Sequence, residues 1–128
     1  MCIGHGYDLH RLEPLAPAGS GKPLVICGAC LDEAQRGPLG HSDGDVGYHA
    51  LTDAILGAMG EDDLGTLFSN TDPQWRDADS SVFVREAVHR MQAAGYVIGN
   101  VDLTIICEQP QIAPHRVAMA INIAELLE

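Results

Sequence analysis

The stretch from His41 to His49, with the sequence HSDGDVGYH, places two histidines, a serine and two aspartates directly before a segment of helical periodicity. One face of that segment carries apolar residues at helical spacing, namely Leu51, Ala54, Ile55, Ala58 and Met59. The pattern predicts a helix from about Asp45 to Ala58, with Asp43 or Asp45 as its N-cap. Polar side chains and free backbone N–H groups therefore gather at one helix N-terminus, where anions bind well.

The other face of this helix is polar, because Asp45, His49 and Asp53 follow one another at four-residue spacing. A neighbouring carboxylate is therefore expected to orient the His49 ring. A second polar stretch near the N-terminus, GHGYDLH, reads as the start of a strand, and its glycines indicate a close backbone approach to another part of the fold. In an extended segment Asp8 and His10 point to the same face, about 7 Å apart, so both can contact one ion.

The chain is strongly acidic. Its 18 acidic and 7 basic residues give a net charge of −11, so no binding to nucleic acid or to a membrane is expected. A phosphorylated ligand would have to be neutralised by metal ions, histidine and backbone N–H groups. The lack of an 18-residue apolar run and of a signal peptide predicts a soluble cytoplasmic protein, and leaves open a plastid protein without its transit peptide. Four scattered cysteines are too few for a disulfide scaffold: Cys2, Cys27, Cys30 and Cys107.

The remaining segments alternate between strands, helices and turns. Further strands are predicted at Lys22–Cys30 and Tyr96–Cys107, and further helices at 81–94 and from Pro114 onward. Asp79 or Ser80 would cap the helix at 81–94, which would end at Gly95 and bury Val84, Val88 and Met91. Turn-rich segments lie between these elements, at 11–22, 31–40, 60–79 and 108–113. The order predicts one α/β or α+β domain over residues 1–128 with a mixed sheet.

Three of the polar side chains suit a metal ion. Asp8, His10 and His49 form an oxygen–nitrogen–nitrogen set typical of zinc with a fourth position open for water or substrate. Manganese, cobalt or iron could occupy the same set. The competing interpretation is that His10 is a surface residue at a strand end and that His49 is a solvated helix residue.

Other motifs are weaker. Asp43-Gly44-Asp45 begins like a calcium loop, but Gly47 and Tyr48 stand where a ligand and a glycine are required. Cys27-x-x-Cys30 would be half of a zinc site or a redox pair, but no second Cys/His pair follows at the spacing of a zinc ribbon. Two small residues near a strand end are the simpler interpretation. No role is predicted for the remaining histidines, His5, His89 and His115.

Four segments together resemble one family, the 2-C-methyl-D-erythritol 2,4-cyclodiphosphate synthases of non-mevalonate isoprenoid biosynthesis. They are GHGYDLH at 4–10, GHSDGDVGYHALTDAILGA at 40–58, DLGTLFSNTDP at 63–73 and GYVIGNVDLTIICEQPQIAPH at 95–115. The resemblance implies a chorismate-mutase-like fold with a mixed four-stranded sheet and helices on one face. It also implies a homotrimer with active sites between adjacent subunits.

The same resemblance implies roles for the matching residues. Zn²⁺, or another divalent transition metal, would be bound by Asp8, His10 and His49, the first two also contacting substrate. The catalytic, phosphate-contacting histidine would be His41, with Ser42 beside it. The ribose of a cytidine nucleotide would be held by Asp63, Leu64 and Gly65. A mobile loop over the methylerythritol part would comprise Phe68, Ser69, Asn70, Thr71 and Asp72. The cytosine pocket would be formed, largely by backbone groups, by Cys107, Glu108, Gln109, Pro110, Gln111, Ile112 and Ala113.

The implied reaction is an intramolecular phosphoryl transfer, a phosphorus–oxygen lyase reaction without a protein nucleophile. The 2-phosphate of 4-diphosphocytidyl-2-C-methyl-D-erythritol 2-phosphate attacks the β-phosphorus, closes a cyclic diphosphate and expels CMP. This chain departs from the family pattern at three places. It has Ser69 where the family commonly has a proline and Gln111 where the family commonly has a lysine. Its loop at 11–22 is longer than usual.

The family pattern also continues past the position of Glu128. The tail there carries further strand structure and a Thr-Thr-Glu segment, whose glutamate binds a second metal, Mg²⁺ or Mn²⁺. The chain is therefore expected to be C-terminally truncated relative to the family. Two alternatives follow: a non-catalytic remnant that binds zinc and a cytidine nucleotide, and an unrelated zinc phosphohydrolase with the same three ligands.

Overall fold

Short antiparallel strands form the first third of the computed structural model, which describes residues 1–128. β1 (Leu12–Pro14) pairs with β4 (Arg36–Pro38), and β2 (Val25–Ile26) pairs with β3 (Ala29–Cys30). Cys27 and Gly28 form the two-residue turn between β2 and β3 and have φ angles of 50° and 73°. Positive φ at both positions gives a turn whose twist matches that of the flanking strands.

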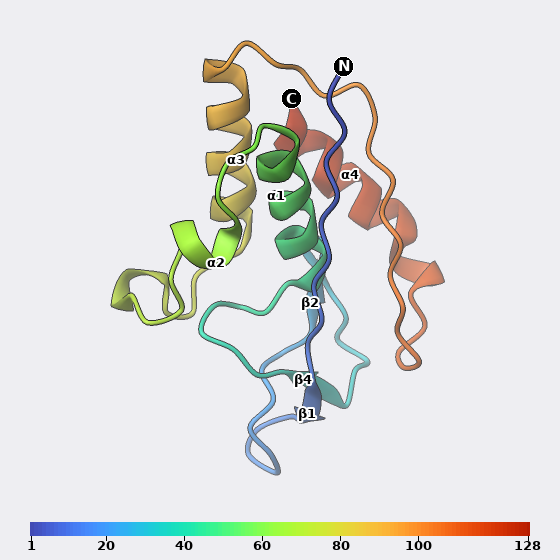
Figure 1. Ribbon diagram of the computed structural model, residues 1–128. Coiled ribbons are helices and arrows are strands. Elements are labelled where there is room, and N and C mark those ends of the chain that lie inside the picture. Colours follow the sequence, from blue (N-terminus) through green and yellow to red (C-terminus); the bar gives the residue numbers. More distant parts are fainter.

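Helices make up most of the rest of the chain. They are α1 (Val46–Ala58), α2 (Leu64–Leu67), α3 (Ser81–Ala93) and α4 (Arg116–Leu127), with 3₁₀ turns η1 (Pro73–Trp75) and η2 (Ala113–His115). α1 packs against α3, α3 also contacts α4, and the N-terminal segment runs along α1 (Figure 1). The predicted helices are confirmed, including Asp45 as the N-cap of α1 and a Gly95 with a φ of 85° after α3. No helix combines the length and apolar character needed to cross a membrane.

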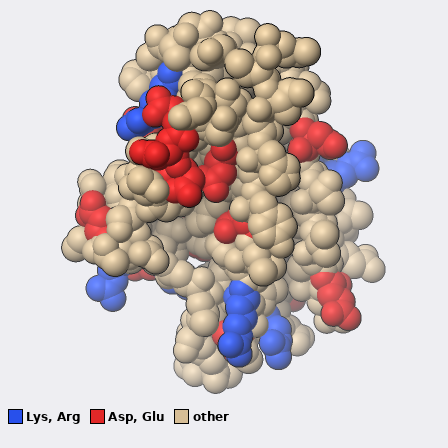
Figure 2. Space-filling view, viewed as in Figure 1, with Lys and Arg blue, Asp and Glu red and all other residues tan.

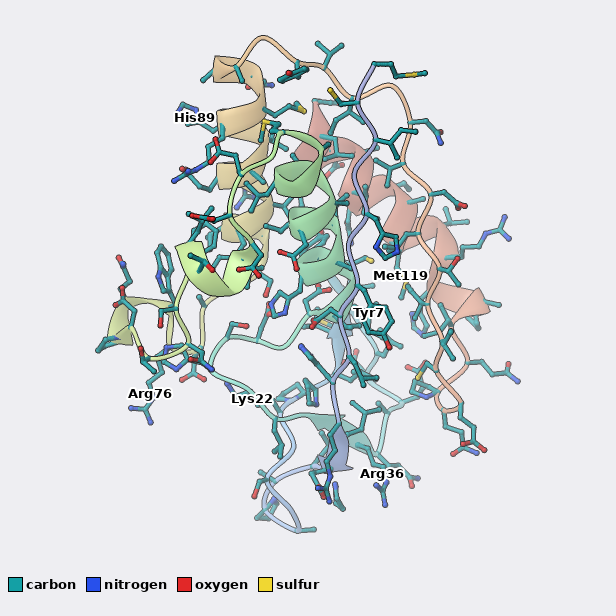
Figure 3. All side chains as sticks on the ribbon, viewed as in Figure 1. Tyr7, Lys22, Arg36, Arg76, His89 and Met119 are labelled. Atoms are coloured by element: carbon teal, nitrogen blue, oxygen red, sulfur yellow. The ribbon has the colours of Figure 1, made fainter.

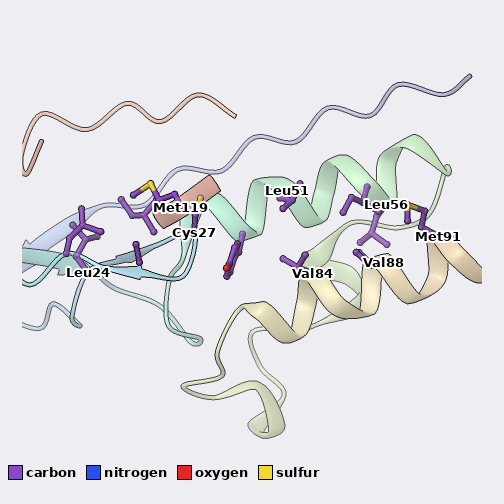
Figure 4. Packing of buried hydrophobic residues seen from close by; sticks show 14 of the residues in the cluster. Leu24, Cys27, Leu51, Leu56, Val84, Val88, Met91 and Met119 are labelled. Carbon is purple, nitrogen blue, oxygen red and sulfur yellow. The ribbon is translucent and has the colours of Figure 1, made fainter. Parts of the chain in front are cut away.

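The hydrophobic core lies between α1 and α3 and continues toward the β2–β3 hairpin (Figure 4). Leu51 and Leu56 of α1 are 2% and 0% exposed, and they pack with Val84, Val88 and Met91 of α3, the residues predicted to be buried. Burying one such side chain contributes about 1.5–3 kcal/mol. The packing therefore fixes α1 firmly, and with it the polar residues at its N-terminus.

The predicted mixed four-stranded sheet with helices on one face is wrong for the described chain, which is a small α+β domain with two separate two-stranded antiparallel sheets. The segment 11–22, predicted to be a loop, contains β1, and the predicted turn at 31–40 contains β4. These two strands pair across more than 20 residues of chain. Local sequence does not reveal such a pairing, and the prolines in both strands argue against it.

Two segments predicted to be strands are extended but belong to no sheet: residues 2–10 and 96–107. In the second segment Val101, Leu103 and Ile105 are partly buried against the core, whereas Asp102 and Thr104 are exposed. The predicted alternation of faces is therefore correct. The predicted hydrogen-bond ladder is absent, because no other segment of the described chain pairs with either one.

The N-terminal segment instead rests directly on α1. A Cβ added to Gly4 would overlap the carbonyl group of Ala54, and one added to Gly6 would overlap that of Ala50. The close backbone approach predicted from these glycines is confirmed. It brings the following residues, Asp8 and His10, to the N-terminal half of α1.

Candidate metal centre

Asp8, His10 and His49 meet where the extended N-terminal segment crosses the first turn of α1. His10 Nε2 lies 2.8 Å from Asp8 Oδ2, and His49 Nδ1 lies 3.1 Å from the same oxygen. One ligand atom from each residue lies within 4.8 Å of the other two, and no other such group of three occurs in the described chain. The three side chains are 12–25% exposed, so the centre is sheltered but reachable.

The hydrogen bonds of His10 test whether a cation fits here. His10 Nδ1 lies 2.8 Å from the carbonyl oxygen of Gly44, which can only accept. Nδ1 therefore carries a hydrogen, and Nε2 is directed at the Asp8 carboxylate. Two electron-rich atoms at this separation require a proton or a metal ion between them. An imidazole nitrogen and a carboxylate oxygen held in this way are typical ligands of a divalent transition metal, so the residues fit such an ion.

The charge state of Asp8 also suits a ligand. Burial acts to raise the pKa of Asp8, but the hydrogen bonds and charges of His10 and His49 outweigh it and hold this pKa well below its ordinary value. The hydrogen bond to Asp8 in turn raises the pKa of His10, against the opposing effect of burial. Asp8 is therefore ionised at neutral pH, as a ligand must be.

The carboxylate beside His49 is Asp8 and not one from its own helix. Asp45 is fully buried and accepts from the backbone N–H groups of Cys27, Gly28 and Tyr48 at 2.8, 2.8 and 3.0 Å. Asp53 accepts from the backbone N–H of Leu64 at 2.8 Å. The predicted polar line along α1 exists, but its two aspartates hold neighbouring segments and do not orient His49.

Ser42 adjoins the centre, and His41 precedes it in the chain. Ser42 Oγ lies 3.3 Å from His49 Nε2, and the side chain is largely buried. His41 Nε2 donates to the carbonyl oxygen of Asp72 at 2.7 Å. The 68–72 segment is thereby tied to the histidine that was predicted to act on phosphate.

The predicted substrate residues between 63 and 72 have structural roles in this conformation. Asp63 caps α2 by accepting from the backbone N–H of Thr66, and Asp72 caps η1 in the same way. Phe68 is 8% exposed, with its ring 5.2 Å from that of Trp75 and 4.7 Å from that of Phe83. The loop is therefore anchored at its start, while the residues after Phe68 are more open.

The predicted cytosine pocket is not brought to the centre by this chain. In Figure 1 the turn at 107–113 projects beside α4, whereas α2 and the 68–72 segment lie on the other side of α1. The only side-chain hydrogen bond within the turn runs from Cys107 Sγ to the carbonyl oxygen of Gln109, at 3.3 Å.

A polar cavity of about 460 Å³ opens beside His41, and the sequence analysis assigned no role to its two cations. Lys22 Nζ donates to the carbonyl oxygen of Ser42 at 2.6 Å and pairs with Asp77 at 2.8 Å, which lowers the pKa of Asp77. Arg76 lines the same cavity and forms no ion pair; both cations are labelled in Figure 3. Two features of the sequence could have drawn attention to these residues: Lys22 is the one lysine of the chain, and Arg76 is the one cation in the acidic 60–79 segment.

The fold and the site define a small α+β protein with an aspartate–histidine–histidine group that could hold a metal ion. The chain belongs to the YgbB family, whose model matches residues 1–128. The resemblance drawn from the four sequence segments is thereby confirmed.

Curated relatives carry the corresponding enzyme name. The chloroplastic 2-C-methyl-D-erythritol 2,4-cyclodiphosphate synthase of Catharanthus roseus is 50% identical over 125 residues, which cover 98% of this chain and 50% of the relative. The synthase of the same name from Proteus mirabilis (strain HI4320) is 51% identical over 125 residues, covering 98% and 74%. A solved synthase structure in a CDP-bound form is 42% identical with a TM-score of 0.86, covering 98% of this chain and 79% of that one. The chain thus spans about half the length of its plant relatives.

Proposed function

We propose that the protein containing these residues is a cyclodiphosphate synthase of isoprenoid biosynthesis. It would convert 4-diphosphocytidyl-2-C-methyl-D-erythritol 2-phosphate to 2-C-methyl-D-erythritol 2,4-cyclodiphosphate and CMP, as a phosphorus–oxygen lyase. The observation that carries this proposal is the meeting of Asp8, His10 and His49 beside Ser42, in a chain half identical to relatives that bear the synthase name.

The residues of the chain would act mainly by holding the substrate. The attacking phosphate and the diphosphate belong to one molecule, so fixing them in line is worth up to roughly 7–11 kcal/mol. A divalent cation on Asp8, His10 and His49, for which we propose Zn²⁺, would polarise a phosphate oxygen and neutralise charge. His41 and Ser42 would donate hydrogen bonds to the charge that develops on the transferring group.

Loop position and His41 orientation are coupled in this scheme. The hydrogen bond from His41 Nε2 to the carbonyl oxygen of Asp72 joins the ring to the 68–72 segment. A movement of that segment over the methylerythritol part would therefore turn His41 at the same time. Lys22 supports the other side of the site, because its bond to the Ser42 carbonyl fixes the backbone from which the serine hydroxyl projects.

Arg76 would supply a positive charge to the substrate phosphates. It is free of ion pairs and lines the cavity that contains His41. Figure 2 shows acidic side chains gathered elsewhere on this face, and the exposed run Glu61-Asp62-Asp63 lies where α1 leads into α2. In so acidic a chain, a guanidinium that lines the cavity is well suited to attract a phosphorylated substrate.

The nucleotide part would be bound between subunits of a homotrimer. Asp63, Leu64 and Gly65 would hold the ribose, and the 107–113 turn of an adjacent subunit would form the cytosine pocket. The distance between these two segments within one chain in Figure 1 supports this division. A second cation, Mg²⁺ or Mn²⁺, is part of the proposal, but the described residues offer no second ligand set, so we derive no step for it. The protein would act in the cytoplasm or in a plastid.

The experiment incubates the purified protein with the substrate, Zn²⁺ and Mg²⁺ in ¹⁸O-labelled water. We expect equal amounts of CMP and of a cyclic diphosphate without ¹⁸O. Incorporation of ¹⁸O would indicate a hydrolase, and binding of CDP without CMP release would indicate a nucleotide-binding remnant; both would overturn the proposal. His49→Ala should abolish CMP release, whereas His89→Ala, at an exposed position on α3, should not (His89 is labelled in Figure 3).

A further inference from the structure

A buried serine contacts the ring nitrogen of His49 that does not face Asp8. His49 Nε2 lies 2.8 Å from Ser80 Oγ, closer than the 3.3 Å to Ser42 Oγ. Ser80 is 0% exposed and stands at the N-cap of α3, yet its side chain makes no capping hydrogen bond to that helix. A serine at this position usually caps, so the Ser80 hydroxyl has a different function here.

Asp43 fixes the direction of the bond between Ser80 and His49. Its Oδ1 accepts from the Ser80 hydroxyl at 2.5 Å and from the backbone N–H of Asp45 at 3.0 Å, and its Oδ2 accepts from the backbone N–H of Ser80 at 3.0 Å. The single hydroxyl hydrogen of Ser80 therefore points to Asp43. Only lone pairs of Ser80 Oγ remain for His49.

We propose that Ser80 and Asp43 are positioning residues that keep His49 in the tautomer with hydrogen on Nε2. His49 Nδ1 then presents its lone pair toward Asp8, at 3.1 Å from the carboxylate oxygen. The inference rests on the metal centre of the proposed function. It assigns opposite ring nitrogens to the two imidazole ligands. His10 would bind the cation through Nε2, because its Nδ1 donates to the Gly44 carbonyl. His49 would bind it through Nδ1, because its Nε2 donates to Ser80.

This arrangement also connects the two helices at the centre. Ser80 precedes the first residue of α3, and Asp43 lies shortly before α1. A ligand histidine whose second nitrogen donates to a fixed partner is the usual design of such sites, and removing that partner typically costs about 10–100-fold in metal affinity.

The first test uses the unmodified protein. Nitrogen-15 NMR of the histidine-labelled protein loaded with Zn²⁺ should show hydrogen on Nε2 of His49 and on Nδ1 of His10. Hydrogen on Nδ1 of His49 would overturn the proposal, and this outcome does not depend on the folding of any variant.

The second test compares Co²⁺ affinity and tautomers in Ser80→Ala and in a matched control. Ser80→Ala should weaken Co²⁺ binding about 10–100-fold and shift His49 toward the other tautomer, while His10 stays unchanged. Ser81→Ala removes a neighbouring hydroxyl whose contact is Arg85, at 3.0 Å, and should change neither quantity. A folded Ser80→Ala protein with unchanged Co²⁺ affinity and unchanged His49 tautomer would overturn the proposal. Absence of CMP release would count against the proposed function only, since neither readout uses turnover.

Discussion

Replacing Gly6 by alanine should weaken cation binding although no ligand is removed. Gly6 lies two residues before Asp8 and faces the backbone of α1, where an added Cβ would overlap the carbonyl oxygen of Ala50. Real Cβ atoms essentially never come closer than 3.0 Å to another heavy atom. The N-terminal segment would therefore have to move away from α1 by roughly 1 Å, a displacement known to be functionally severe.

The size of the effect follows from the geometry of the centre. Metal–ligand distances are held to within about 0.2 Å, so a shift of this size separates Asp8 and His10 from His49. Loss of a single supporting residue around a metal site costs about 10–100-fold in affinity. Moving two of three ligands should cost at least roughly 100-fold, or about 2.8 kcal/mol.

The assay is a Co²⁺ titration followed by visible absorption, with helix content checked by circular dichroism. Gly99→Ala is the matched control, because an added Cβ at Gly99 meets nothing within 4 Å; it should bind Co²⁺ like the unmodified protein. A Gly6→Ala protein of normal helix content that binds Co²⁺ with undiminished affinity would refute the inference that close contact with α1 positions the ligands.

Three further predictions concern stability and substrate binding. Asp45→Ala leaves three backbone N–H groups without an acceptor, of which those of Cys27 and Tyr48 are buried, and should lower the free energy of unfolding by roughly 2–3 kcal/mol or more in urea; a loss below about 1 kcal/mol would contradict this. Burial raises the pKa of the Cys27 thiol from 9.0 to about 12, so ionisation favours the unfolded chain, and stability should fall as the pH rises from 9 toward 12. At pH 8 iodoacetamide should label the exposed Cys2 and Cys30 but spare Cys27; rapid labelling of Cys27 would show that it is not buried. Arg76→Gln should raise the KM for the phosphorylated substrate roughly tenfold with unchanged Co²⁺ affinity; an unchanged KM would remove Arg76 from the site.

The features that could be predicted from the sequence are those decided within a few residues. The apolar spacing after Asp45 identified α1, and the two-residue spacing of Asp8 and His10 identified a shared face, because both depend only on local backbone geometry. The meeting of this pair with His49 was a weaker expectation. It depends on Gly4 and Gly6, which allow the N-terminal segment to rest on α1.

The features that could not be predicted depend on distant partners. The sequence made Asp43 and Asp45 equivalent candidates for the cap of α1. The choice depends on distant groups: Asp45 also accepts from the backbone N–H of Cys27 in the hairpin turn, whereas Asp43 accepts from the backbone N–H of Ser80. Asp79 or Ser80 was expected to cap α3; the Ser80 hydroxyl contacts His49 instead, and Asp79 accepts from the backbone N–H of Ser81. Whether an extended segment joins a sheet likewise depends on a second segment, so the alternation in 96–107 was predicted correctly and its pairing was not.

Anomalous diffraction at the zinc absorption edge, from crystals grown with Zn²⁺, tests the three-ligand centre most directly. We expect one peak about 2.0–2.2 Å from a carboxylate oxygen of Asp8, from His10 Nε2 and from His49 Nδ1. Zinc found only at other residues, such as the exposed thiols of Cys2 and Cys30, with no peak between these three side chains, would contradict the assignment of the centre.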